Sequence, residues 1–93
     1  MNTFLISYDL GLPETISDYH ILIEYIKFYG VWAKPLQSVW LIKTNKSIAR
    51  VRDEIKLRID SNDRVLVIDV TGTAWATYNI SQKVTDWMKD NLQ

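Results

Sequence analysis

Strand and helix patterns alternate along this chain in an order that few folds accept. Four short apolar runs rich in β-branched and aromatic residues predict strands, and they cover residues 3–10, 31–36, 37–44 and 64–70. Helical spacing of apolar residues predicts two helices between them, one ending near Tyr29 and one running from Ser47 to Ile59. Strand, helix, strand, strand, helix, strand is the order of a split βαβ sandwich, with the helices on one face of a four-stranded antiparallel sheet. The sequence therefore predicts an α+β protein with the ferredoxin-like βαββαβ architecture.

The first predicted helix carries signals at both of its ends. Thr15 followed by Asp18 resembles a capping box, and Ser17 is a competing N-cap. Gly30 stands where a left-handed C-cap is expected. In the strand that follows, Pro35 indicates an edge strand or a bulge.

The tail, residues 73–93, follows the sandwich as an appendage. Residues 74–78 predict a short fifth strand, and a third helix follows with Asn79 or Ser81 as its cap. Together with a core of about residues 3–72, the tail makes one domain, residues 1–93, as expected for a chain of 93 residues.

Side-chain alternation along the strands predicts a second buried surface. We assign these side chains to the face under the helices: Phe4, Ile6, Tyr8, Val39, Leu41, Leu66, Ile68 and Val70. The opposite face then carries Leu5, Ser7, Asp9, Ser38, Trp40, Ile42, Val65, Val67 and Asp69. Such a face is too apolar to remain in water. Either the tail helix covers it or another subunit does, and we expect a homodimer through this face or its edge, braced by the tail helix.

Composition excludes several classes of site. The chain has no cysteine and one histidine, His20, so disulfides, thiolate ligands, cysteine nucleophiles and a histidine-rich metal cluster are excluded within one chain. We expect His20 to be an exposed polar residue. No apolar run reaches about 18 residues, and no basic segment precedes the first apolar run, so neither a transmembrane helix nor a secretory signal is predicted. A cytoplasmic protein without membrane contact is expected.

Charge is distributed unevenly although the net charge is zero. Residues 31–60 carry seven basic residues against three acidic ones. Four of them form a candidate nucleic-acid-binding group: Arg50, Arg52, Lys56 and Arg58. The alternative is that these charges form a solvated helix face. The four tryptophans could likewise stack on bases or build the core and an interface.

Short motifs at the ends of these elements resemble a known family. They are Tyr8-Asp9 after the first strand, Tyr29-Gly30 after the first helix, the hairpin residues 37–40, and residues 63–65 after the basic helix. In this order they resemble the second core CRISPR-associated protein family, called Cas-two here, with its VapD-type ribonuclease relatives and the small stand-alone SinR-like proteins. The resemblance covers about residues 3–72, and the tail departs from the family pattern.

The resemblance implies a homodimeric, metal-dependent endonuclease, with RNA favoured over DNA as the substrate. Asp9 would be the catalytic and metal-binding residue and would meet its symmetry mate at the dimer axis. Mg²⁺ is the cation implied, since it prefers oxygen ligands and activates bound water. Four further residues are candidate supporting residues: Ser7, Tyr8, Ser38 and Asp69.

Other interpretations of the same residues stay open. Asp9 could form a turn before Gly11, and Ser38 could occupy a bulge. Asp69 could stand at the solvent-facing end of the sheet. At the level of function, the alternatives are a non-catalytic nucleic-acid-binding or adaptor dimer with the same fold and a toxin-like partner protein.

Overall fold

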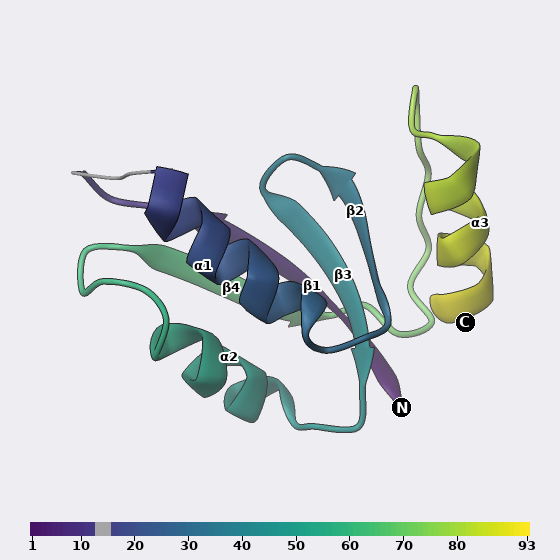
Figure 1. The fold of residues 1–93 in the computed structure, drawn as a ribbon. Coiled ribbons are helices and arrows are strands. Elements are labelled where there is room, and N and C mark those ends of the chain that lie inside the picture. Colours follow the sequence, from purple (N-terminus) through teal and green to yellow (C-terminus); the bar gives the residue numbers. More distant parts are fainter. Residues whose placement is uncertain (13–15) are drawn as a thin grey trace.

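The computed structural model describes residues 1–12 and 16–93 (Figure 1). Its elements are β1 (Asn2–Asp9), α1 (Ile16–Lys27), β2 (Trp32–Leu36), β3 (Val39–Thr44), α2 (Ile48–Lys56), β4 (Arg64–Asp69) and α3 (Gln82–Asn91). The four strands form one sheet in the order β2-β3-β1-β4, and every neighbouring pair is antiparallel. The predicted α+β class with a four-stranded antiparallel sheet is confirmed.

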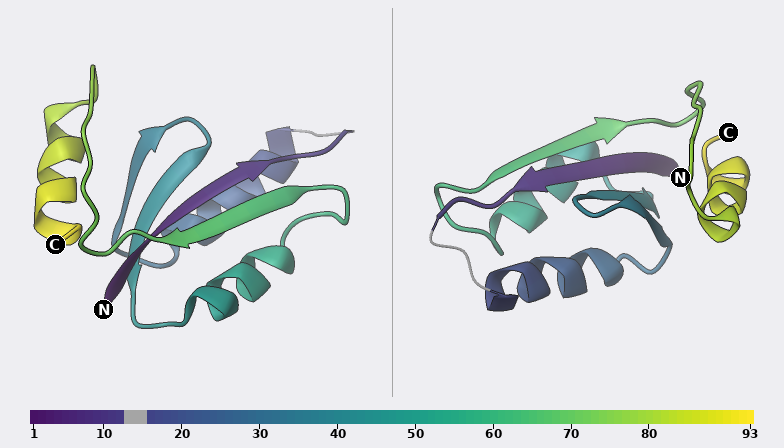
Figure 2. Two further views of the ribbon diagram at one scale, coloured as in Figure 1. Left: turned by 180° about the vertical axis from the view of Figure 1, so that it is seen from behind. Right: turned by 90° about the horizontal axis from the view of Figure 1, so that it is seen from above.

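The helices α1 and α2 lie on the same side of the sheet, and α3 stands apart from them at the end where the N-terminus lies (Figure 2). Under α1 and α2 the main core is built from the sheet side chains Phe4, Ile6 and Trp40. The helices contribute Leu22, Ile26, Val51 and Ile55, all fully buried. The predicted stripe on α2 therefore faces this core, although Ile48 at its start stays exposed.

The strand register corrects the assignment of side chains to the two faces. Phe4 pairs with Ile42 and Ile6 pairs with Trp40, so Trp40 and Ile42 lie under the helices, not on the opposite face. Val65 and Val67 on β4 also pack against this core, which leaves Leu66 and Ile68 on the opposite face. The assignment was right for β1 and inverted for β3 and β4. The physical reason is that alternation looks the same when a strand is turned over, and only the pairing register decides between the two faces.

A second, smaller core lies between α3 and the opposite face of the sheet. Leu41 is buried there against Met88 and Leu92, with Leu5, Val70, Val84 and Trp87 packed around them. Backbone contacts also hold the tail: the Thr3 hydroxyl donates to the Asn91 carbonyl, and the Gly72 N–H donates to the Leu92 carbonyl at 2.9 Å. The tail helix thus braces this face, as predicted, at the end of the sheet near the N-terminus.

The predicted helix and strand ends are confirmed in part. Ser47 is the N-cap of α2 and Ser81 that of α3, and Gly30 has the left-handed φ of 88° expected after α1. Ser17 lies inside α1, so it is not the cap, while the Thr15 capping box lies outside the described residues.

Residues 74–78 form no strand, which corrects the predicted fifth strand. The chain turns at Gly72, with φ 71°, and then runs exposed toward α3 with no neighbouring strand to pair with (Figure 1). The longest described helix, α1, has 12 residues, and none of the described helices has the length and apolar character needed to cross a membrane.

Candidate functional site

Asp9 is the last residue of β1, the strand that lies between β3 and β4 in the sheet. It is exposed and projects from the same face as Ser7, away from α1 and α2. Across the β1–β4 ladder, Asp9 pairs with Arg64 and Ser7 pairs with Leu66. These residues, with Tyr8 and Val65, line a shallow hollow of about 220 Å³. The predicted catalytic role of Asp9 would be carried out in this hollow.

The described residues around Asp9 do not by themselves make a ligand set for a magnesium ion. Mg²⁺ needs near-octahedral oxygen ligation, and among the described residues that line this hollow Asp9 is the only carboxylate. Its cross-strand neighbour is the cation Arg64, which competes with a metal for the carboxylate. No group of three or more His, Cys, Asp or Glu side chains placed to hold a metal occurs in the part of the chain that the structure describes. Among the described residues, Asp9 is thus the one carboxylate that could ligate a metal at this hollow.

Asp69, which we expected on the same face as Asp9 and as a supporting residue, does not neighbour Asp9. It pairs with Phe4, five residues along β1 from Asp9, at a rise of about 3.4 Å per residue. It also belongs to the helix-side register of β4. Its carboxylate accepts a hydrogen bond from the Thr71 N–H at 3.0 Å, and the backbone and side-chain hydrogen bonds of Thr71 lower the pKa of Asp69. Asp69 is therefore a turn-forming residue after β4.

Tyr8 and Ser38 take different positions. Tyr8 is buried, and its hydroxyl accepts a hydrogen bond from Trp40 Nε1 at 3.2 Å. It is a core residue. Ser38 is exposed in the two-residue turn between β2 and β3, whereas the strand irregularity lies between Ala33 and Leu36. Because Val39 pairs with Ser7, Ser38 lies at the same end of the sheet as Asp9.

Three members of the predicted basic group interact with acidic residues or carbonyl groups of α2 itself. Arg50 Nε lies 3.3 Å from Glu54, Arg52 pairs with Asp53 at 2.9 Å, and Arg58 donates to the Glu54 carbonyl at 2.9 Å. Arg52 and Lys56 also line a hollow together with Arg64 on β4. The group is therefore not one surface: the part beside the sheet edge is Arg52, Lys56 and Arg64, a set that we call the edge cations.

Glu54 is a polar centre that our sequence reasoning did not single out. Its carboxylate accepts hydrogen bonds from four side chains: Tyr25, Tyr29, Lys46 and Arg50. Partial burial acts to raise the pKa of Glu54, but these hydrogen bonds, that of Lys46 foremost, lower it to about 2. Burial, and then the bond to Glu54, raise the pKa of Tyr29. Two local signals could have indicated it: tyrosines four residues apart at and just after the end of α1, and basic residues four residues either side of Glu54.

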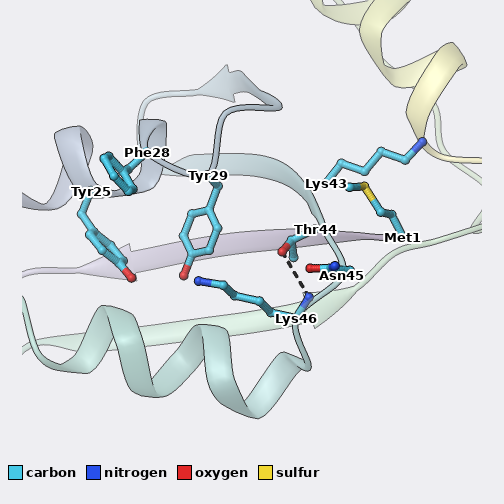
Figure 3. Close-up of a pocket in the computed structure, with 8 residues that line it drawn as sticks. All are labelled: Met1, Tyr25, Phe28, Tyr29, Lys43, Thr44, Asn45 and Lys46. Carbon is cyan, nitrogen blue, oxygen red and sulfur yellow. Dashed lines mark hydrogen bonds between the residues drawn. The ribbon is translucent and has the colours of Figure 1, made fainter.

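A pocket opens beside this centre (Figure 3). It lies between the end of α1 and the segment that joins β3 to α2, and its volume is about 270 Å³. Its lining residues are Met1, Tyr25, Phe28, Tyr29, Lys43, Thr44, Asn45 and Lys46. Our sequence reasoning missed the pocket because its walls come from segments far apart in the chain.

Comparison with known proteins adds no assignment. No protein-family model matches the chain, and no solved structure matches it at a significant level. Function must therefore be argued from the residues and the geometry above.

Proposed function

We propose that this protein is a homodimer of ferredoxin-like chains, of the Cas-two/VapD type, that cleaves phosphodiester bonds in nucleic acid, RNA in preference to DNA. Each chain would contribute Asp9 to a shared site. The observation that carries the proposal is the position of Asp9: it is exposed at the end of a central strand, on the face that α1 and α2 leave bare. The strand order β2-β3-β1-β4 with both main helices on one face supports the ferredoxin-like assignment.

The part of this face that α3 does not cover supports the proposed dimer. The tail helix packs near Thr3 and Leu5, at the far end of β1 from Asp9. Near Asp9 the face presents Leu66, which is 55% exposed, and further along β4 the exposed Ile68. Apolar side chains on an open sheet face are typical of an interface. A second copy packed over this free half brings the two Asp9 carboxylates toward a common axis, while the α3 helices stay at the outer ends.

The residues around Asp9 limit the reaction steps that its carboxylate can support. One chain offers a carboxylate that can accept a proton from an attacking hydroxyl or water, and Arg64 beside it can stabilise negative charge on a phosphate. A divalent cation would need Asp9 of both chains as ligands and would supply the water activation described for such ions.

The edge of the sheet favours a second candidate function, a non-catalytic nucleic-acid-binding dimer. The β2 edge carries Lys34, Pro35 and a register shift, which protect an edge strand against pairing. The β4 edge is apolar from Val65 to Ile68, and this stretch has no lysine, no proline and no register shift.

A dimer formed by pairing of two sheet edges and a dimer formed by packing of two sheet faces place the two Asp9 residues at different separations. Pairing of two β4 strands would set the two Asp9 residues about 20 Å apart, from strand spacings of roughly 4.8 Å and a rise of roughly 3.4 Å per residue. That dimer could not share a site at Asp9. It would instead form one continuous sheet flanked by two sets of edge cations, which suits contact with phosphates.

The test of catalysis is the cleavage of labelled single-stranded RNA and DNA with Mg²⁺ or Mn²⁺. We expect Asp9→Asn to lower the cleavage rate roughly 100-fold or more, and Asp90→Asn, which changes an exposed carboxylate on α3, to leave it unchanged. Equal rates for natural chain and Asp9→Asn, or no cleavage by either between pH 6 and 9, would contradict the catalytic proposal.

The binding candidate is tested on the same nucleic acids without metal. It predicts salt-dependent binding that weakens when Lys56→Gln and Arg64→Gln are combined, with Lys83→Gln on α3 as the matched control. Binding that is insensitive to salt and to both changes would rule it out.

A further inference from the structure

β4 is an edge strand, and part of its backbone faces open space. The Val70 N–H donates to the Thr3 carbonyl at 2.9 Å, which continues the register of the β1–β4 ladder, so the backbone of Val70 points toward β1. In an antiparallel ladder, the backbone groups turn toward the neighbouring strand at every second residue. The N–H and C=O groups of Leu66 therefore also face β1, whereas those of Val65 and Val67 point away from the sheet. No strand among the described residues pairs with them.

Two hollows flank this open edge on the side of α2. The smaller, of about 240 Å³, is lined mainly by apolar side chains, among them Ile48 and Val67. The larger, of about 540 Å³, opens toward the loop after α2 and is lined by Lys56. Arg52 and Val65 line both hollows, which therefore adjoin and form one groove between α2 and the edge of β4. Figure 2 shows β4 at the margin of the sheet, with α2 on one side of it.

One cation of this groove has no acidic partner. Lys56 is exposed and forms no ion pair in the part of the chain that the structure describes, whereas Arg52 is paired with its neighbour on α2. Two carboxylates line the larger hollow, those of Asp60 and Asp63, and neither lies within ion-pair distance of Lys56. Both oxygens of Asp63 accept backbone N–H groups. The groove therefore has an apolar end and, one helical turn beyond Arg52, the ammonium group of Lys56.

We propose that the edge of β4 binds an extended segment of another protein as an added antiparallel strand, with an acidic side chain of that segment at Lys56. Strand addition gives the outward N–H and C=O groups of Val65 and Val67 their hydrogen-bond partners, and the side chains opposite these valines enter the groove. The side chain opposite Val67 meets the apolar end. The side chain opposite Val65, two residues later in the partner, meets Lys56. The segment that fits therefore has an apolar residue two positions before an acidic one.

A second copy of the chain fits this groove less well. The acidic side chain that β4 itself offers is Asp69, which already accepts the Thr71 N–H of its own turn at 3.0 Å. Pairing of two β4 strands also brings two Arg52 side chains toward each other across the seam, since Arg52 lines both hollows, and like charges oppose such pairing. The partner segment therefore competes with the edge-paired dimer of the second candidate function. A dimer packed through the opposite face of the sheet leaves the groove open.

The test is an NMR titration of the ¹⁵N-labelled chain with a capped peptide of the sequence Ser-Thr-Thr-Val-Thr-Glu-Thr-Thr-Ser. In the free chain, we expect the amide hydrogens of Val65 and Val67 to exchange rapidly with solvent and that of Leu66 to exchange slowly, because only Leu66 faces β1. The peptide should shift the signals of Val65 and Val67 in a saturable way and slow their exchange. Asp9→Asn should bind the peptide like the natural chain, so failure at this edge and failure of the proposed cleavage are distinguishable.

An exchange of charge tests the role of Lys56. Lys56→Glu should weaken binding of this peptide roughly three-fold or more, and should bind more tightly a second peptide in which lysine replaces the glutamate. Lys83→Glu makes the same change at an exposed residue of α3 and is the matched control. It should bind both peptides as the natural chain does.

Three results would overturn the proposal: no saturable shift with millimolar peptide, equal affinity of the natural chain and Lys56→Glu for both peptides, or slow exchange at Val65 and Val67 without peptide. The last result would show that the edge is already paired, as in a dimer formed through β4. Protection of the same two amides by single-stranded RNA and not by the peptide would also overturn the proposal and would assign the groove to nucleic acid.

Discussion

The hydroxyl of Tyr29, in the turn after α1, donates a hydrogen bond of 2.8 Å to Glu54 Oε1, on α2. The same oxygen accepts from Tyr25 at 3.1 Å, and Lys46 Nζ, from the segment between β3 and α2, lies 2.9 Å from it. One carboxylate thus ties both main helices and the segment between β3 and α2 together. Its side chain is only 20% exposed, so these bonds are shielded from water. The stability of the helical layer should therefore depend on the charge of Glu54.

We predict that Glu54→Gln lowers the free energy of unfolding at pH 7 by about 2 kcal/mol. The folded state holds the pKa of Glu54 at about 2, below its ordinary value of 4.5. A lowered pKa means that the contribution is fully present above about pH 4.5 and is lost as the pH falls toward 2. Urea denaturation between pH 2 and pH 7 should therefore show a steeper loss of stability for the natural chain than for Glu54→Gln.

The control for this prediction is Asp53→Asn, next to Glu54 on the same helix. Asp53 pairs with Arg52 in an exposed position, and such pairs contribute little. We expect this variant to follow the pH curve of the natural chain. Parallel curves for Glu54→Gln and the natural chain would contradict the role of Glu54.

Removal of the Tyr8 hydroxyl should lower stability without affecting activity. Tyr8→Phe leaves the buried indole N–H of Trp40 without its acceptor, which costs about 1–3 kcal/mol. The expected result is a lower urea midpoint and an unchanged rate in any cleavage assay run well below the melting temperature. A lower rate in fully folded Tyr8→Phe would instead return Tyr8 to the candidate site.

A side chain at Gly11 should not fit. A Cβ at this position would lie 2.6 Å from the backbone oxygen of Asn62, and the Gly11 N–H donates to Asp63 Oδ1 at 2.7 Å, so the close approach of the two loops is needed. We predict that Gly11→Ala destabilises the protein by about 1–3 kcal/mol. The neighbouring Leu12→Ala, at an exposed side chain, is the control and should unfold at the same urea concentration as the natural chain.

Leu66→Lys should separate the proposed dimer into monomers. Leu66 is exposed on the free half of the sheet face, so a lysine there leaves the chain's own core intact but puts a charge into the proposed interface. We expect light scattering at micromolar concentration to report twice the chain mass for the natural protein and the single chain mass for Leu66→Lys. Leu57→Lys, at an exposed position after α2, should remain dimeric. A natural chain that is monomeric at 100 μM would remove the shared Asp9 site.

The positions of the helices and strands could be read from local sequence signals. Ser47 and Ser81 cap helices because their side chains reach the backbone N–H groups of the first turn, an interaction within four residues. The segment around Trp75 shows the limit of such signals, since its residues favour a strand but no neighbouring strand is there to pair with.

Local sequence signals also predicted part of the candidate site. Side-chain alternation along β1 predicted that Asp9 is exposed on the face away from α1 and α2. This prediction is confirmed because the orientation of β1 was assigned correctly. That Asp69 lies five residues away along the ladder could not be foreseen, because the register of β4 against β1 is a contact between residues far apart in the chain. The hydrogen-bonded centre at Glu54 was not predicted for the same reason: Tyr29 and Glu54 are 25 residues apart in sequence.

The sequence alone determined the order of the elements, the α+β class and the absence of cysteine chemistry, because these depend on residue type and on spacings within one helix or strand. Only the tertiary structure decided that Trp40 points toward α1 and α2, that Leu41 meets α3, and that Asp9 stands opposite Arg64. Each of these is set by the pairing of strands, which a shift of one residue would reverse. The sequence therefore predicted that Asp9, at the end of β1, lies at the surface, whereas the packing of the strands decided which residues lie beside it.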